Sequence, residues 1–505
     1  MRRRHFLQHL GAAGALLACP RLARAAPWGA YPDAVAPGAL PEARLAKNVL
    51  DIFLYGGLCP WETFYVVPEY GHPNDPQYAR QQWWTFQEGP DSVAATYAAC
   101  YGAAAPPMLQ EFRVDETGAM VNLGPFSEPL RSRKDIIDRL RIHVVSHSLE
   151  PHEAAIPYAL SGFRLGQPKL AGLGSAVQHY FSARAPVFTG EPYAYVLYSP
   201  GDFPTDNLRA ASAIGQHPGS ARPLAIKVEA NTAFIDALGR KVLGDKRTAV
   251  DALVSQWTAD YRQRLTWPGG TPVRAQAVSD YSFALETLQN TGVLSGILES
   301  KYFQGVAGTA CGESSNPNHP HMALDLAAHL LTRPGSQAKY VNVVDGGLIA
   351  ASGGGGYDTH DRHIRDSGRN LTNLWRGLTR IINQPGENDP TKLNLDETLV
   401  VINTEFGRTP WEQNGTGRNH HPYAYTTLMF GGPVGNDQQG IVGSIGADGF
   451  AANALPPAAP RAAVLQALGI FPFAPECYAV SDVPGAVTEL DAALLLNELV
   501  LGVKA

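Results

Sequence analysis

Two short segments of the chain concentrate side chains of the kind that bind metal ions. One is YDTHDRH, residues 357–363, and the other is TEFGRTPWEQNGTGRNHHP, residues 404–422. Zinc and manganese accept their carboxylate and imidazole donors, and a pair of such ions about 4 Å apart can polarise an ester oxygen while activating a nucleophile. The candidate metal ligands in these segments are Asp358, His360, His363, Glu405, His420 and His421.

Each segment follows a stretch that predicts a buried β-strand. The runs KYVNVV, residues 339–344, and TLVVIN, residues 398–403, are short, apolar and rich in β-branched side chains. Between them, apolar residues recur at helical spacing over 371–382, and PGENDP, residues 385–390, ends that helix. This order predicts a βαβ unit with its polar residues at the carboxyl ends of parallel strands, where open α/β sheets bind ligands.

A further carboxylate and two arginines extend this candidate site. The segment NVLDIFLYGG, residues 48–57, predicts the first strand of the sheet, and Glu62 lies past its end as another candidate metal ligand. Asp51 falls inside the strand and is interpreted as structural. Arg408 and Arg418 are candidates for holding an anionic group through paired hydrogen bonds, with ion pairing at the surface as the alternative.

A second region with reactive side chains lies at residues 141–162. IHVV predicts a strand and HEAAIPYALSG the start of a helix, with Ser148 in the turn between them and His152 at the start of the helix. A hydroxyl at such a turn can act as a nucleophile, because the developing charge faces the amino end of the helix. Ser148 and His152 are therefore catalytic candidates. The alternative is that Ser148 caps the turn and the histidines are solvated.

The first 25 residues predict an export signal that is absent from the mature protein. Arginines at positions 2–4 precede Phe6 and Leu7, a short apolar stretch follows, and Ala-Arg-Ala at 23–25 is a cleavage site of small-x-small type. The arginines indicate a twin-arginine signal, with an ordinary secretory signal as the alternative. The stretch is too short and glycine-rich to span a membrane, and the mature chain has no other candidate. The expected location is the periplasm or the extracellular space.

The net charge of the mature protein excludes nucleic acid as a partner. The whole chain has 40 Lys and Arg against 46 Asp and Glu, and the predicted signal contains five arginines and no acid. Its removal leaves 35 basic and 46 acidic side chains, a formal charge of −11. An acidic surface of this kind repels nucleic acid.

The length of 505 residues suits one large α/β domain over 26–505, with a mainly helical insertion at about 187–333. The mature chain keeps four cysteines, which in an oxidising compartment could form two disulfides in any of three pairings. None has the CxxC spacing of a zinc ribbon. They are Cys59, Cys100, Cys311 and Cys477.

Several motifs carry a resemblance to a known family. The twin-arginine leader, LYGG with ETF soon after it, GGGGYDTH, INTEFGRTP and GRNHHPYAYTTLMFGG together resemble the exported sulfatase-like family of the alkaline phosphatase superfamily. The resemblance spans nearly the whole mature chain and implies an alkaline-phosphatase-like, doubly wound, mainly parallel sheet with helices on both faces. By position it implies one ligand cluster of Asp358 with His360 or His363, with Glu405 in place of a ligand aspartate and His420 as the late histidine ligand.

Two hypotheses of function follow. The first is an exported hydrolase that uses a divalent metal, zinc or manganese, on an anionic substrate, a phosphate or sulfate ester. The second is a catalytically silent envelope protein of the same fold that binds a glycan or a protein partner. Chelator-sensitive hydrolysis discriminates the first from the second. The sequence indicates no oligomeric state for either.

Overall fold

The computed structural model describes most of the chain from residue 27 onward. The predicted export signal at 1–25 and the glycines at 353–355 lie outside the described residues. The described residues are 27–70, 89, 91–102, 108–163, 172–182, 192–198, 224–233, 235, 245–264, 291–335, 338–348, 356–436 and 438–503. Among them, no helix is both long enough and apolar enough to cross a membrane.

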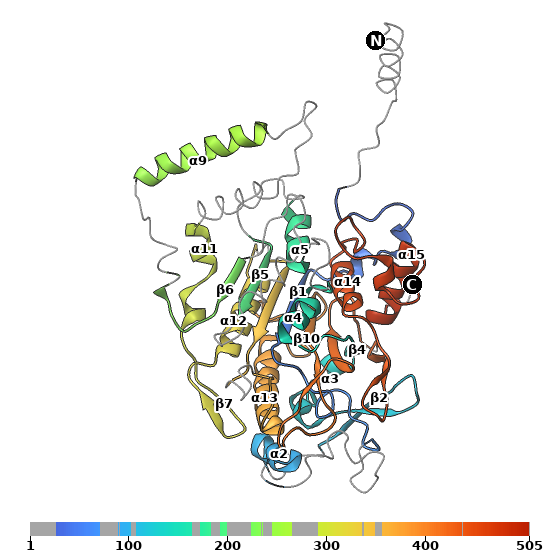
Figure 1. Cartoon of the computed structure of the whole chain (residues 1–505). Helices are drawn as coiled ribbons and strands as arrows, with labels where there is room; N and C mark the ends of the chain where they lie inside the picture. The colour runs from blue at the N-terminus through green and yellow to red at the C-terminus, as the bar shows by residue number, and fades with distance from the viewer. Residues whose placement is uncertain are drawn as a thin grey trace, which may run out of the picture.

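An eight-stranded sheet with helices packed on its two faces forms the centre of the protein (Figure 1). The order of its strands is β14-β4-β13-β10-β1-β9-β5-β6. In chain order the strands are β1 (Asn48–Leu54), β4 (Arg141–Val145), β5 (Ala194–Tyr198), β6 (Leu224–Lys227), β9 (Tyr340–Asp345), β10 (Thr398–Thr404), β13 (Tyr425–Phe430) and β14 (Gly440–Val442).

The sheet is mixed, and the prediction of a doubly wound, alkaline-phosphatase-like topology is wrong. Strand β13 runs antiparallel to both of its neighbours, β10 and β4, whereas the other neighbouring pairs are parallel. The reason lies in the connection between β10 and β13. It contains the short ribbon of β11 (Gly407–Arg408) and β12 (His420–His421) in place of a crossover helix, so the chain turns back beside β10.

The two strands of the expected βαβ unit are present as β9 and β10, with α13 (His363–Ile381) between them in sequence. They are not neighbours, however, because β1 lies between them and pairs in parallel with both. Leu54 at the end of β1 lies opposite Asp345 on one side and Thr404 on the other. The carboxyl ends of the three strands therefore meet at one level of the sheet edge.

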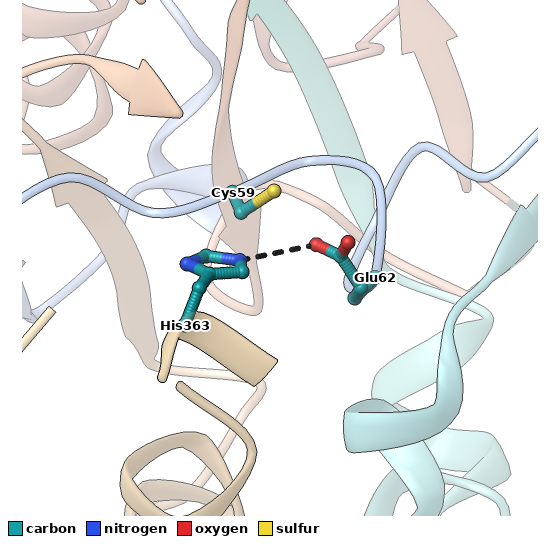
Figure 2. Close-up of side chains that lie close together, drawn as sticks. All are labelled: Cys59, Glu62 and His363. Atoms are coloured by element: carbon teal, nitrogen blue, oxygen red, sulfur yellow. Dashed lines mark hydrogen bonds and ion pairs between the residues drawn. The ribbon is translucent and has the colours of Figure 1, made fainter. Parts of the chain in front are cut away.

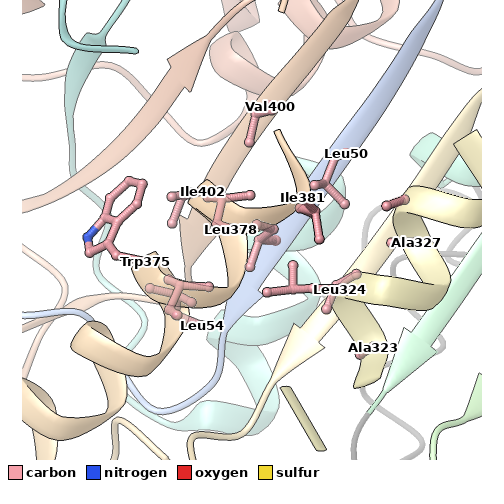
Figure 3. Packing of buried hydrophobic residues seen from close by; sticks show 14 of the residues in the cluster. Leu50, Leu54, Ala323, Leu324, Ala327, Trp375, Leu378, Ile381, Val400 and Ile402 are labelled. Carbon is pink, nitrogen blue, oxygen red and sulfur yellow. The ribbon is translucent and has the colours of Figure 1, made fainter. Parts of the chain in front are cut away.

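Alternate residues of β1 enter cores on opposite faces of the sheet, as the two-residue period of a strand requires. Leu50, Ile52 and Leu54 are fully buried in the core that includes α12 (His319–Thr332) and α13 (Figure 3). On the other face, Val49 packs with α5 (Leu173–Ser182) and α14 (Ala458–Ala467), and Phe53 with α4 (His152–Ser161). Burying each such side chain stabilises the folded state by about 1.5–3 kcal/mol. Because sliding β1 along its neighbours would disturb this burial, the packing fixes the level at which the strands end.

Smaller elements surround the sheet. The range 187–333 contributes strands β5 and β6 to the sheet as well as helices, and α14 and α15 lie near the end of the chain. The remaining helices and strands are α2 (Val93–Tyr101), β2 (Gln110–Val114), β3 (Met120–Leu123), α3 (Lys134–Ile137), α9 (Asp245–Arg264), α11 (Thr291–Ile297), β7 (Gly308–Ala310), β8 (Glu313–Ser315), β15 (Ser444–Ile445), β16 (Ala451–Asn453) and α15 (Glu489–Leu495).

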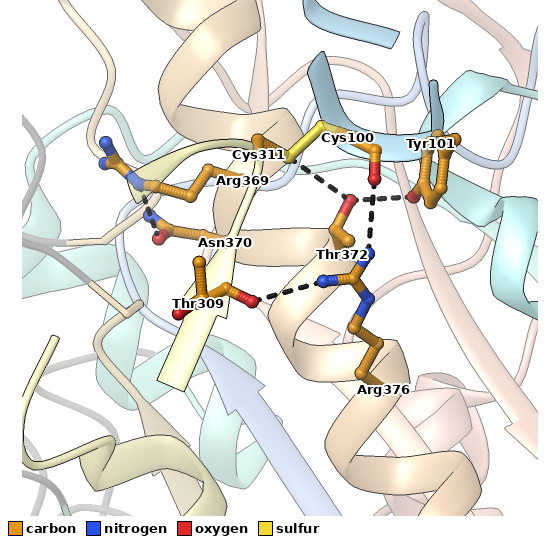
Figure 4. Close-up of a disulfide and its surroundings, with 8 residues drawn as sticks. All are labelled: Cys100, Tyr101, Thr309, Cys311, Arg369, Asn370, Thr372 and Arg376. Atoms are coloured by element: carbon orange, nitrogen blue, oxygen red, sulfur yellow. Dashed lines mark hydrogen bonds between the residues drawn. A yellow bond between two sulfur atoms is a disulfide. The ribbon is translucent and has the colours of Figure 1, made fainter. Parts of the chain in front are cut away.

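One disulfide, Cys100–Cys311, joins α2 to the turn after β7, 211 residues further along the chain (Figure 4). The hydroxyl of Thr372 on α13 lies 2.7 Å from the Tyr101 hydroxyl, and Arg376 donates to the carbonyls of Cys100 and Thr309. Helix α13 therefore contacts both ends of the bridge. The other two cysteines of the described residues, Cys59 and Cys477, are buried and free.

A candidate metal centre at the carboxyl ends of the strands

Four side chains from three different elements converge beside the ends of β1, β9 and β10. His152 is the first residue of α4, and His420 lies on β12. Asp358 and His360 belong to the loop before α13 and approach β1 closely at Gly56. Gly56 has a φ of +116°, and a Cβ at this position would collide with the backbone nitrogen of Asp358. Only glycine permits this approach, which brings the Asp358 loop against the end of the strand.

The donor atoms of these four side chains face one another. The Nε2 atoms of His152, His360 and His420 lie 3.4, 3.1 and 3.6 Å from Oδ1 of Asp358. The Nε2 atoms of His360 and His420 are 3.0 Å apart. Three imidazole nitrogens therefore lie beside one carboxylate oxygen, and His152, Asp358 and His420 each offer a donor atom within 4.8 Å of the other two.

The second nitrogen of each ring is hydrogen-bonded outside the cluster. Nδ1 of His152 lies 2.9 Å from the Glu405 carboxylate, Nδ1 of His360 lies 2.9 Å from the Gln413 side-chain oxygen, and Nδ1 of His420 lies 2.9 Å from the Glu150 backbone carbonyl. All three partners are acceptors, so each Nδ1 carries a proton in the neutral ring and each Nε2 presents a lone pair to the cluster. Outer acceptors of this kind orient the histidine ligands of metal sites.

Lone pairs and a carboxylate at such short separations repel one another unless a proton or a metal ion lies among them. A proton can supply part of that charge: burial disfavours charge on His152, but hydrogen bonds with Asp358 and Glu405 outweigh burial and raise its pKa to about 9. Burial alone would raise the pKa of Asp358. The three histidines and Arg408 outweigh burial and hold that pKa well below its usual range. The Nε2 of His152 is nevertheless buried without a hydrogen bond of good geometry in the described residues. The cluster is therefore arranged to hold positive charge at its centre.

Buried groups support the cluster from behind and from its sides. Arg408 has no exposed surface and donates to Asp358 and to the carbonyls of Gly56 and Arg418. Phe406 packs against the ring of His420 with centroids 4.4 Å apart and against His152 with centroids 4.9 Å apart. These contacts restrict the rotation of the imidazoles and hold the carboxylate in place, so the donor atoms keep their positions.

Two predicted ligands, Glu62 and His363, lie in a separate buried group with Cys59 (Figure 2). Nε2 of His363 lies 3.4 Å from Oε2 of Glu62, and Arg418 forms an ion pair with Oε1 of the same carboxylate. Burial alone would raise the pKa of Glu62, but Arg418, His363 and Cys59 together outweigh it and lower that pKa to about 2. Burial lowers the pKa of His363 to about 4. This group therefore contains an ionised carboxylate and a neutral imidazole.

The remaining predicted site residues lie around the cluster, outside its centre. Glu405 is fully buried and accepts from the Gly56 amide at 2.8 Å as well as from His152. His421 faces away from His420, and its Nε2 bonds the Gly449 carbonyl at 2.7 Å. Ser148 is exposed in the turn before α4, and within the described residues no hydrogen bond or ion pair joins it to the cluster.

Three residues that contribute to the cluster or to the separate buried group had little or no signal in the sequence. Glu150 takes part through its backbone carbonyl, to which any residue type could contribute. Gln413 is an amide in a loop, 53 residues from its histidine partner. Cys59 is a lone cysteine without CxxC spacing, and the proximity of Glu62 three residues later was its one local indication.

A buried carboxylate at the end of β9 gives the fold a pH dependence. Asp345 accepts from the Gly347 amide at 2.7 Å and from the Tyr357 hydroxyl at 3.2 Å. Burial outweighs these hydrogen bonds and raises its pKa from 3.8 to about 6. An aspartate with a raised pKa destabilises the folded state increasingly as the pH rises from about 4 to about 6, and the full cost remains above that range.

We therefore expect Asp345→Asn to stabilise the protein more near pH 8 than near pH 4. A shift of two pKa units corresponds to roughly 3 kcal/mol, of which roughly 2 kcal/mol develops between these two pH values. Urea unfolding of both proteins at each pH measures the difference. A stability difference between wild type and Asp345→Asn that is the same at both pH values would contradict this assignment.

The comparisons with known proteins identify a family but no activity. A family model described as a protein of unknown function, DUF1501, matches residues 46–472. No curated protein matches the sequence. The resemblance to a sulfatase-like family of the alkaline phosphatase superfamily is therefore wrong, because the matching model is neither a sulfatase nor an alkaline phosphatase model.

Proposed function

The chain belongs to the DUF1501 family of proteins of unknown function, and we propose that it is a metal-dependent hydrolase. The observation that carries the proposal is the convergence of three imidazole Nε2 atoms on Oδ1 of Asp358, each ring being held through Nδ1 by an outer acceptor. We assign His152, His360, His420 and Asp358 as the ligands of one divalent ion.

The spacing of the donor atoms suits a transition metal. In a tetrahedral site with bonds of about 2.0–2.1 Å, the ligand atoms lie about 3.3–3.4 Å from one another. The separations of Oδ1 of Asp358 from the three imidazole nitrogens, and of the His360 nitrogen from the His420 nitrogen, range from 3.0 to 3.6 Å. Imidazole with one carboxylate is a donor set that zinc and manganese accept, so either ion fits these residues.

The cluster is partly exposed, so an ion held by these four side chains could expand its coordination to five and take up water or an ester oxygen. The side chains of His152, His420 and His360 are 15%, 19% and 32% exposed. A divalent ion bound there supplies Lewis acidity to an ester oxygen and lowers the pKa of water. Arg408 keeps Asp358 in place, and Glu405 keeps His152 in the tautomer that binds metal. Because Ser148 lies outside the cluster, we propose water as the attacking group.

Charge supports an anionic substrate. A divalent ion contributes +2, Asp358 and Glu405 each contribute −1, and Arg408 contributes +1, which leaves the site with a net charge of +1. A positively charged site of low dielectric constant attracts an anionic phosphate or sulfate ester more strongly than it attracts a neutral ester. We therefore propose phosphate or sulfate esters as the substrate class.

We also propose that the protein acts outside the cytoplasm, in the periplasm or beyond it. The twin-arginine pattern at the start of the sequence supports export of the folded protein. The Cys100–Cys311 disulfide supports an oxidising compartment, where such bonds persist.

Chelator-sensitive hydrolysis tests the proposed reaction. The mature protein is assayed with p-nitrophenyl phosphate, bis-p-nitrophenyl phosphate and p-nitrophenyl sulfate after treatment with a chelator and after addition of zinc or manganese. We expect hydrolysis of at least one ester, loss of activity on chelation and recovery with metal. Metal-loaded protein that hydrolyses none of them would contradict the proposed substrate class and favour a silent envelope protein. Activity that is insensitive to the chelator would contradict the metal mechanism.

A further inference from the structure

The group of Cys59, Glu62 and His363 is enclosed, in contrast to the open cluster described above. Cys59 and Glu62 belong to the loop that follows β1, and His363 is the first residue of α13. Glu62 and His363 have no exposed surface, and Cys59 is 1% exposed. Figure 2 shows the sulfur, the carboxylate and the ring nitrogen turned toward a common point.

The positions of the donor atoms resemble those of a small metal site. A sulfur, a carboxylate oxygen and an imidazole nitrogen of the three residues lie within 4.8 Å of one another. The distance of 3.4 Å between Nε2 of His363 and Oε2 of Glu62 is long for a strong hydrogen bond, and it is the separation of two ligands on one ion with bonds of about 2.1 Å. On the other side of the ring, Nδ1 of His363 lies 2.5 Å from the Thr359 hydroxyl, which directs Nε2 toward Glu62.

The charges around the group also suit a cation. Arg418 occupies Oε1 of Glu62 and leaves Oε2 to face His363. With a divalent ion, a Cys59 thiolate and the Glu62 carboxylate, the group including Arg418 has a net charge of +1, so the ion replaces the thiol proton without leaving a large uncompensated charge. Thiolate, imidazole and carboxylate are the three ligand types that zinc binds in proteins.

We propose that Cys59, Glu62 and His363 form a second metal site, enclosed and structural, that binds zinc. It differs from the open cluster in its thiolate ligand and in the absence of a solvent-exposed side. The segment 358–363 contributes ligands to both sites, because Asp358 and His360 belong to the open cluster and His363 to the enclosed one. Zinc in the enclosed site therefore fixes the end of the segment that positions Asp358 and His360.

Cobalt(II) substitution tests the enclosed site without any assay of activity. Mature protein freed of metal by chelation is reloaded with cobalt, and its near-ultraviolet absorption and cobalt content are measured. We expect two equivalents of cobalt and a thiolate-to-cobalt charge-transfer band. Cys59→Ser should lose the band and one equivalent. Cys477→Ser, which changes the other buried free cysteine, should retain both.

The wild type and Cys477→Ser decide the question even if Cys59→Ser does not fold. With Cys100 and Cys311 in a disulfide, Cys59 is the one free thiol left in mature Cys477→Ser protein. A charge-transfer band there supports the proposal, and its absence in cobalt-loaded protein would overturn it. His360→Ala separates the two sites, because it should retain the charge-transfer band while losing the equivalent of cobalt bound by the open cluster. The absence of metal from one site can therefore be detected independently of the other.

Discussion

Replacement of His360 by alanine is expected to remove the metal from the open cluster and to lower hydrolytic activity by about 10³-fold or more. His360 contributes one of four donor atoms, and its Nε2 lies within 3.1 Å of two others. Metal-assisted polarisation and activation of water contribute several kcal/mol to such a reaction, and about 4 kcal/mol corresponds to a thousandfold in rate. Metal content by elemental analysis and the rate of ester hydrolysis measure the two effects.

His360 is a better target than Asp358 because its removal leaves no buried charge behind. Asp358→Asn would leave the fully buried Arg408 without its carboxylate, at a cost of about 3–5 kcal/mol in stability. The matched control is His329→Ala on α12, which removes an imidazole bonded to the Ile297 carbonyl, away from the cluster. Equal metal content in wild type, His360→Ala and His329→Ala would show that the cluster binds no metal.

Replacement of Glu405 by glutamine is expected to weaken metal binding by about 10–100-fold while leaving the fold intact. Glu405 touches no ion in the proposed site; its carboxylate orients His152 through Nδ1 and also accepts from the Gly56 amide. An amide of the same shape keeps one acceptor oxygen but loses the negative charge that makes the imidazole more basic. Loss of an outer acceptor of this kind typically costs metal sites this range of affinity.

Competition for zinc against a chromophoric chelator measures the affinity of the Glu405 variant. Glu397→Gln is the matched control, because this glutamate lies just before the same strand and pairs with Lys47 at the surface. An affinity in Glu405→Gln equal to that of the control would contradict the role assigned to Glu405. A variant with weakened binding and unchanged thermal unfolding of the metal-free protein would support it.

The strands were predictable, but the way they assemble was not. The β-branched runs at 339–344 and 398–403 correspond to β9 and β10 because local composition determines which segments are buried strands. Insertion of β1 between them depends on pairing across some 290 and 350 residues, which no local pattern encodes. The antiparallel return at β13 depends on a connection that forms a short two-stranded ribbon and contains no crossover helix.

The candidate site shows the same division. Asp358, His360 and His420 were predicted as ligands because carboxylates and histidines after strand ends meet at one edge of the sheet. His152 was identified as catalytic, whereas the structure places it among the donor atoms. Glu62 and His363 were expected with the other ligands, yet they pack with Cys59 in a separate group. Direction of a side chain, and not its position after a strand, decides which group it joins.

The most direct test of the account is a crystal structure of the zinc-loaded mature protein with anomalous data collected at the zinc edge. The account predicts an anomalous peak about 2.0–2.2 Å from Nε2 of His152, His360 and His420 and from Oδ1 of Asp358, with an open position toward solvent. A zinc-saturated crystal without anomalous density between these four atoms would contradict the central claim.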